Sequence, residues 1–298
     1  MTANLRLIPP AREDHDPQID AYITWARELR GLSKNTLRVR RGFLIGLALY
    51  LGKPLVEATE RDLLYWERDK VSGRAPESRN AYVSHARAFY VWAVKTKLLD
   101  DDPSQCLTRP KLTRGLPRPI SDEDFRLAVG AASPKMRAWL LLGGFCGLRC
   151  QEIAGLNWSD LHTAGHEPTL LVRDGKGGKE RVVPVPQPVI DALVAHGRQR
   201  SGPMFYGLDA RQIEARSVSS GLNAFFKRVG IDATAHQLRH RYATTAYRLT
   251  KDIRLVQELL GHSSPNTTAV YAAFDQSQAA GMVAAMEEQW AADVAETA

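Results

Sequence analysis

The sequence predicts a mainly α protein, built from a helical N-terminal domain and a mostly α second domain that carries a small antiparallel hairpin. Three observations lead to this prediction. Residues 16–100 contain four apolar patterns of helical period and no alternating strand pattern. A proline-rich, basic stretch follows over residues 101–119. Beyond it, the helical patterns are interrupted once, where two β-rich runs flank a glycine-rich turn within residues 170–185.

Each N-terminal helix is predicted from a start signal and, for three of them, an apolar face. The start signals are a cap with a first-turn proline at Asp16-Pro17, a cap at Ser33, a capping box of Thr59 with Asp62, and Pro76. The first two helices are expected to stop at Gly31 and Gly52, and the fourth at Leu99. The expected apolar faces comprise Ile19, Tyr22, Ile23, Ala26 and Leu29, then Leu37, Leu44 and Leu47, then Ala81, Tyr82, His85, Phe89, Trp92 and Ala93.

We expect residues 1–104 to form the helical domain, 105–119 a linker, and 120–298 the second domain, after a lead-in over the first 15 residues. In the second domain, Ser121 caps the first helix with Asp124 three residues later, and helical patterns continue to Leu156. Further helices are expected over 187–200, 217–229, 236–250, 252–260 and 277–290.

The composition favours a soluble cytoplasmic protein with a polyanionic partner. The formal net charge is +7, with +4 in residues 1–110 (18 Lys and Arg, 14 Asp and Glu) and +3 in the remainder (22 and 19). Both halves are thus mildly basic, which fits two domains that hold one polyanion. No apolar run approaches the ~20 residues that span a bilayer, and the N-terminus lacks a signal-peptide pattern. The three cysteines, Cys106, Cys146 and Cys150, are expected to be free thiols.

Two cations stand out against their surroundings in the second domain. Arg149 interrupts an apolar stretch, so its guanidinium needs a partner or an anion, and Glu152 three residues later can hold it. Lys176 occupies the glycine-rich turn, which lacks the pattern of a phosphate-binding P-loop. Taken alone, the first is explained by a structural salt bridge and the second by a solvated turn.

Three further polar positions lie on the later helices. His236 and Arg239 share one helix face and can direct their donors at the same phosphate. His262 follows Gly261, a glycine that ends a helix, and Tyr271 follows nine residues later. Taken alone, His236 and Arg239 are explained as two residues on the surface of a helix, and Tyr271 as a tyrosine of the core.

Together, these residues resemble the tyrosine recombinase (phage integrase) family, whose catalytic pattern reads Arg, Lys, His-x-x-Arg, His or Trp, Tyr. The matching strings, in order, are GLRCQEIAGL, GKGGKERVVPV, HQLRH and LLGHSSPNTTAVY. The resemblance covers residues ~120–275 specifically, and the helical domain matches the family's core-binding domain in size and pattern only. Cys146 and Arg241 depart from the family pattern, at positions where Thr, and Thr or Ser, are common.

The resemblance implies a role for each of these residues. Arg149 and Arg239 would clamp the scissile phosphate, Lys176 would protonate the leaving 5′ oxygen, and His236 and His262 would hydrogen-bond the phosphate, with His236 a candidate base. Tyr271 would attack, giving a 3′-phosphotyrosyl bond, while Glu152 orients Arg149. No metal and no other cofactor is implied, because the phosphotyrosine conserves the bond energy and the arginines neutralise the developing charge.

The resemblance also implies partners: double-stranded DNA clamped by both domains, and a homotetramer on two DNA sites that passes through a Holliday junction. An accessory DNA-bending or directionality factor is compatible with it. The second predicted helix carries four cations, Lys34, Arg38, Arg40 and Arg41. They are either a basic face that contacts the DNA phosphates or groove, or the ordinary charged residues that keep a surface helix soluble. In the C-terminal tail, apolar residues at helical spacing would pack onto the adjacent protomer: Met282, Val283, Met286 and Trp290.

Several functions share this chemistry. We favour an integrase; a Xer-type recombinase that resolves replicon dimers is the alternative, ahead of a type IB topoisomerase and a DNA-binding regulator without catalysis. The compact two-domain layout and the His262 to Tyr271 spacing favour a recombinase over a topoisomerase. The sequence does not specify the target site, the direction of recombination, or cleavage in cis or in trans.

Overall fold

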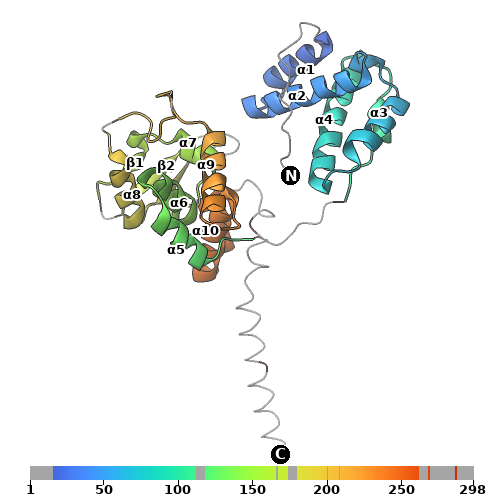
Figure 1. The fold of residues 1–298 in the computed structure, drawn as a ribbon. Helices are drawn as coiled ribbons and strands as arrows, with labels where there is room; N and C mark the ends of the chain where they lie inside the picture. The colour runs from blue at the N-terminus through green and yellow to red at the C-terminus, as the bar shows by residue number, and fades with distance from the viewer. Residues whose placement is uncertain are drawn as a thin grey trace, which may run out of the picture. The chain divides into compact units, whose positions relative to one another are not determined.

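The computed structural model describes residues 16–111, 118–165, 167–173, 180–199, 201–207 and 209–261, with Thr268 and Met286. The chain divides into two compact units, residues 1–114 and 115–298, each of which is described by itself. The described residues are mostly helical with one small antiparallel sheet, which confirms the predicted fold class (Figure 1). Among them, no helix is both long and apolar enough to cross a membrane.

The described residues of the first unit form four α-helices and three short helical turns. Its helices are α1 Pro17–Glu28, α2 Lys34–Leu51, α3 Glu60–Trp66 and α4 Pro76–Lys95, and its turns are η1 Leu55–Glu57, η2 Glu67–Val71 and η3 Pro103–Cys106. The predicted caps at Asp16 and Ser33 accept hydrogen bonds from backbone N–H groups of α1 and α2, and Thr59 forms the predicted capping box with Asp62. Gly52 ends α2 with φ of 66°, a left-handed conformation that glycine adopts without strain.

The core of the first unit is aromatic. Tyr22 of α1 lies edge-on to Phe89 and Trp92 of α4, with ring centroids 5.7 and 5.4 Å apart. Two sequence predictions are wrong here: Leu29 lies beyond the end of α1 and is 73% exposed, and α4 ends at Lys95 instead of Leu99. The backbone turns out of the helix, and Lys97 has a positive φ of 59°.

The second unit is built around the apolar helix α6. Its helices are α5 Asp122–Ala131, α6 Pro134–Cys146, α7 Cys150–Gly155, α8 Gln187–Gly197, α9 Ala215–Arg228, α10 Ala235–Thr250 and α11 Ile253–Leu260, with the turn η4 Trp158–Asp160. Helix α6 is buried on nearly all sides and runs between α8 and α10 (Figure 1). Glycines allow this close packing: a Cβ at Gly143 would meet Leu238 of α10 at 3.1 Å.

The predicted hairpin is present, and a third strand extends it. Strand β2 Thr169–Val172 pairs antiparallel with β3 Arg181–Pro184, in a register that places Leu170 opposite Val183. The short strand β1 Leu161–His162 pairs with the other edge of β2, giving the order β1-β2-β3. The sequence does not predict β1, because two residues are too short to display an alternating pattern.

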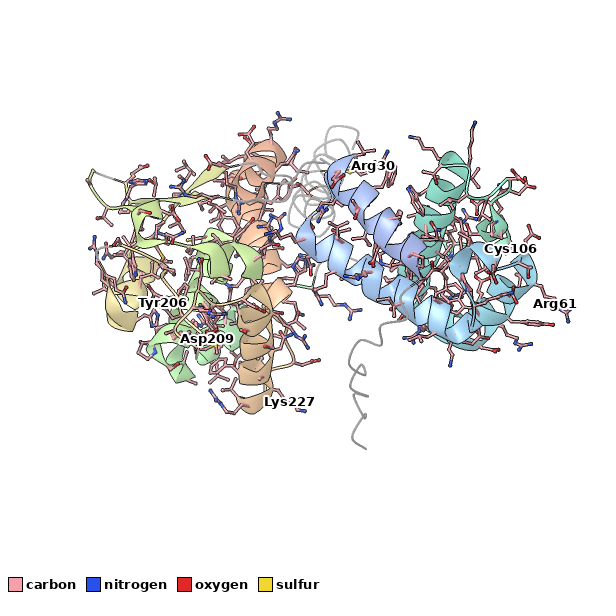
Figure 2. All side chains as sticks on the ribbon, turned by 90° about the horizontal axis from the view of Figure 1, so that it is seen from above. Arg30, Arg61, Cys106, Tyr206, Asp209 and Lys227 are labelled. Carbon is pink, nitrogen blue, oxygen red and sulfur yellow. The ribbon has the colours of Figure 1, made fainter. Side chains whose placement is uncertain are left out.

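Charged side chains cover the surface of each unit. Arg61 of α3 and Lys227 of α9 extend away from the helices that carry them (Figure 2). Arg241, one of the two departures from the family pattern, instead lies inside the second unit, paired with Asp122 of α5 at 2.7 Å and stacked over Phe125 at 4.3 Å. The arginine that stands at this position, where Thr or Ser is common, therefore joins α10 to α5. The three cysteines are free thiols, as expected.

Candidate active site

The site is organised around Glu152, a buried carboxylate in the first turn of α7. Its side chain is 1% exposed. Glu152 Oε2 accepts a hydrogen bond from the backbone N–H of Arg149 at 2.8 Å, and Oε1 accepts one from Arg149 Nη1, also at 2.8 Å. The sequence spacing of three residues brings the two side chains together because Arg149 occupies the N-cap position of α7.

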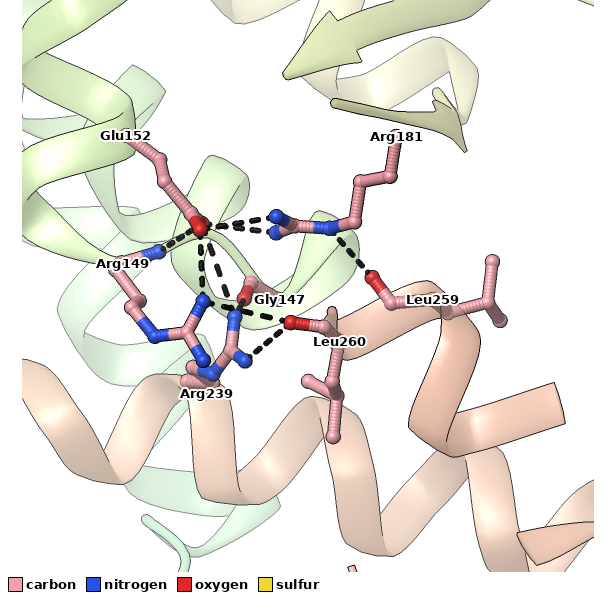
Figure 3. A network of polar contacts seen from close by, with 7 residues as sticks. All are labelled: Gly147, Arg149, Glu152, Arg181, Arg239, Leu259 and Leu260. Atoms are coloured by element: carbon pink, nitrogen blue, oxygen red, sulfur yellow. Dashed lines mark hydrogen bonds and ion pairs between the residues drawn. The ribbon is translucent and has the colours of Figure 1, made fainter. Parts of the chain in front are cut away.

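Two more arginines converge on the same carboxylate from distant parts of the chain (Figure 3). Arg181, the first residue of β3, donates from Nη1 to Glu152 Oε1 at 2.9 Å and from Nη2 to Oε2 at 2.8 Å. Arg239 of α10 places Nη1 3.7 Å from Glu152 Oε2. Three guanidiniums around one carboxylate leave a net charge of about two positive units among these four groups.

Backbone carbonyls hold the arginines in place. The carbonyl of Gly147 and that of Leu260, the last residue of α11, both accept hydrogen bonds from Arg239. Arg149 Nη1 lies 3.5 Å from the same Leu260 oxygen, and Arg181 Nε donates to the carbonyl of Leu259 at 2.8 Å. Cations are favoured at this end of α11, because the last carbonyls of a helix lack partners within it.

The electrostatics keep Glu152 ionised. Burial alone would raise the pKa of this carboxyl, but the hydrogen bonds and charge of Arg181, the Arg149 N–H and the charge of Arg239 outweigh it and lower the pKa to about 2. The carboxylate is therefore charged throughout the neutral range and keeps its three partners oriented.

Two histidines lie on the same turn of α10 as Arg239. The rings of His236 and His240 meet edge-on, with centroids 4.4 Å apart. Burial, followed by the charges of Arg239 and Arg149, lowers the pKa of His236. Burial, followed by the charges of His236 and Arg239, lowers the pKa of His240 to about 4. At neutral pH both rings are uncharged, so His236 is able to accept a proton.

Gly147 is required by its backbone conformation and by a close contact. Its φ is 65°, and a Cβ there would overlap the ring of Tyr242 on α10. We expect Gly147→Ala to lower the free energy of unfolding by about 2–4 kcal/mol, because left-handed strain and overpacking add. Urea unfolding measures this. The matched control is Gly155→Ala, which has open space around it, and equal stability of the two variants would contradict the expectation.

The structure brings together Arg149, Glu152, His236 and Arg239 of the predicted site. The remaining three predicted residues, Lys176, His262 and Tyr271, lie outside the described residues, as do the tail residues Met282, Val283 and Trp290. Strands β2 and β3 flank the segment that contains Lys176, and α11 ends two residues before His262.

The four cations predicted for DNA contact lie on α2 and have different surroundings. Arg40 Nη1 donates to Tyr22 Oη at 2.6 Å, and Arg41 pairs with Asp20 at 2.7 Å, so both hold α2 against α1. Lys34 is exposed, as is Arg38, whose Nη2 donates to Asn35 at 3.0 Å within the same helix. Lys34 and Arg38 are therefore the members that project most freely to solvent.

Arg181 is not among the site residues that the sequence predicts. It stands at the start of a predicted strand, although it is a cation at the edge of an apolar run, a signal similar to the one that singles out Arg149. The carbonyls of Gly147, Leu259 and Leu260 carry no signal in the sequence. Among the described residues, no group of three or more His, Cys, Asp and Glu side chains could hold a metal ion.

Comparison with known proteins identifies relatives over most of the chain. Residues 128–278 match the phage integrase family. The tyrosine recombinase XerC of Rhodospirillum centenum is 34% identical, over 86% of this chain and 82% of the relative. The tyrosine recombinase XerA of Pyrococcus furiosus is 32% identical, over 82% of this chain and 85% of the relative.

Solved structures share the fold. A lambda integrase (75–356) dimer bound to a COC′ core site has a TM-score of 0.69 at 18% identity, and covers 86% of this chain and 94% of that one. The XerH site-specific recombinase bound to palindromic difH substrate has a TM-score of 0.67 at 19% identity, and covers 92% and 85%.

Proposed function

This chain belongs to the phage integrase family and is a site-specific DNA recombinase that cleaves and rejoins DNA strands, and from that premise we propose that Tyr271 is its nucleophile and that the arginine cluster at Glu152 binds the scissile phosphate. The observation that carries the proposal is the convergence of Arg149 and Arg239 on the carbonyl of Leu260 and on Glu152. Attack on a phosphodiester gives a transition state with an additional negative charge, which two net positive charges match.

In the proposed reaction, the phenolic oxygen of Tyr271 forms a bond to phosphorus while the bond from phosphorus to the 5′ oxygen breaks. His236 accepts the phenolic proton, because its lowered pKa keeps the ring uncharged and available as a base at neutral pH. Lys176 donates a proton to the leaving 5′ oxygen, and His262 hydrogen-bonds the phosphate. The reverse attack by a 5′-hydroxyl of the second duplex reseals the strand, so the bond energy is conserved and no cofactor is consumed.

Strand exchange between two sites requires one protomer for each cleaved strand, so we propose that four copies assemble on two duplexes through a Holliday junction. We assign the exposed cations Lys34 and Arg38 to the duplex surface, with Arg40 and Arg41 behind them. A solved structure of a lambda integrase tetramer bound to a Holliday junction has the same fold, with a TM-score of 0.66. The tail, including Met282, Val283, Met286 and Trp290, is assigned to contact with the adjacent protomer.

The proposal is tested by covalent capture. The protein is expressed in its host cell, the lysate is denatured, and the DNA that stays attached to the protein is sequenced. We expect adducts enriched at short inverted repeats. Adducts scattered over all DNA would favour a type IB topoisomerase, and specific DNA recovered only under native conditions would favour a regulator without catalysis.

The same experiment separates the two recombinase functions. Integration joins two different molecules, so adducts would map to one site on the mobile element and one on the host chromosome. Resolution of replicon dimers uses one site per replicon. The curated relatives at 34% and 32% identity, named XerC and XerA, favour the second. We therefore carry the Xer-type function beside integration as the second candidate.

A further inference from the structure

Arg181 differs from Arg149 in how fully the protein engages it. Its three guanidinium nitrogens all donate to protein oxygens: Nε to the carbonyl of Leu259, and Nη1 and Nη2 to the two oxygens of Glu152. Its side chain is 9% exposed. A guanidinium whose nitrogens are all occupied in a fixed fork is poorly suited to bind a substrate phosphate and well suited to hold other groups in place.

Arg149 shows the complementary pattern. Its side chain is 26% exposed, and Nη1 alone contacts Glu152 and Leu260. Within the part of the chain that the structure describes, no hydrogen bond engages its Nε or Nη2. Arg149 can therefore present two donors to an anion, provided that the charge of Glu152 is satisfied by another cation.

Arg181 also contacts the C-terminal end of α11 and Gly261, which follows it. The backbone of Gly261 passes so close that a Cβ there would lie 3.2 Å from Arg181 Cδ and Nη1. Together with the Leu259 carbonyl, this contact joins the end of α11 to strand β3. Arg181 thus links three segments: the strand that follows the Lys176 turn, helix α7 with Glu152, and the end of α11 before His262.

We propose that Arg181 is a positioning residue of the recombinase: it engages both oxygens of Glu152 and so leaves Arg149 to bind the scissile phosphate. This inference rests on the proposed function of the arginine cluster. Without Arg181, the carboxylate of Glu152 draws on Arg149 and Arg239 for its remaining hydrogen bonds, and one of the two net positive charges is lost. Both effects weaken the binding of the developing negative charge on the phosphate.

The test measures single-turnover cleavage of a duplex that contains the site recovered by covalent capture. We expect Arg181→Met to fold and to cleave about 10- to 100-fold more slowly, by analogy with the loss found when a residue that orients a metal-binding ligand is removed. Arg181→Lys should be intermediate or equally slow, because an ammonium cannot occupy both Glu152 oxygens and the Leu259 carbonyl together.

Arg173→Met is the matched control. Arg173 flanks the same turn on the β2 side and also pairs with a buried carboxylate, Asp160, at 2.7 Å. It contacts neither Glu152 nor α11 by any hydrogen bond or ion pair among the described residues. Both substitutions remove one positive charge, so a cleavage defect specific to Arg181→Met reports on Glu152 and its partners instead of on anchoring of the turn.

A second substrate separates positioning from general structural damage. A methylphosphonate at the scissile position removes one negative charge, so cleavage depends less on the arginines, and Arg149→Ala provides the reference. We expect the defect of Arg181→Met to shrink on methylphosphonate, as that of Arg149→Ala does. An equal defect on both substrates, or wild-type rates for Arg181→Met or a folded Arg181→Lys, would overturn the inference. Absence of any adduct with wild type would instead overturn the proposed function.

Discussion

Tyr271→Phe is expected to abolish covalent capture of DNA while specific DNA binding remains. Phenylalanine keeps the aromatic ring but removes the oxygen that would attack phosphorus, so no phosphotyrosyl bond forms. We expect cleavage to fall by at least ~10⁴-fold, as for other substitutions of a nucleophile. Denaturing gels of protein and labelled site DNA measure the adduct, and native gels measure binding.

The matched control is Tyr242→Phe. Tyr242 lies on α10 three residues after Arg239, with its ring against Gly147, and is therefore a tyrosine beside the arginine cluster. Burial, with a smaller effect of Cys146, raises its pKa to about 12, which disfavours the phenolate. The adduct should persist in this variant. Loss of the adduct in Tyr242→Phe, or its persistence in Tyr271→Phe, would show that the nucleophile is assigned to the wrong tyrosine.

Glu152→Gln is expected to have the largest effect on stability. The amide has the size of the carboxylate but no charge, and its NH₂ group faces donors, so three arginines lose their shared partner. Breaking a buried ion pair of this kind costs about 3–5 kcal/mol. Chemical denaturation of the full chain measures the loss, and the second unit should unfold first.

Asp160→Asn provides the comparison for Glu152→Gln. Asp160 is equally buried, but its partner Arg173 is 52% exposed and can be solvated when the pair is broken. We expect a smaller loss of stability for Asp160→Asn. If the two variants were equally stable, the convergence of three arginines on Glu152 would have no energetic consequence.

The stability difference between wild type and Glu152→Gln should depend on pH. The pKa of Glu152 is lowered in the folded protein to about 2, below its ordinary value of 4.5. A carboxyl with a lowered pKa stabilises the fold fully above its unfolded pKa, and this contribution disappears as pH falls through the folded pKa. The difference should therefore be constant near neutrality and shrink between about pH 4.5 and 2. A difference that grew on acidification would contradict the lowered pKa.

The element types and most helix ends were predictable because their signals are local. Ser33 and Gly52 bound α2 as predicted, since caps and left-handed glycines act on neighbouring backbone groups. The end of α4 was not predictable, because the apolar pattern continues to Leu99 although the folded helix ends at Lys95. Strand β1 was likewise not predictable from local patterns, because it forms only by pairing with β2.

The sequence by itself determined the order of the elements, and it supplied the spaced residues Arg149, His236 and Arg239 that led to the recombinase family. Only the tertiary structure decided how these residues cooperate. The role of Arg181 depends on Glu152, 29 residues earlier, and on Leu259, 78 residues later, and Arg149 meets the Leu260 carbonyl across 111 residues. Such contacts depend on how helices and strands pack, and backbone carbonyls are the same in every residue type, so no sequence pattern records which of them will become a partner.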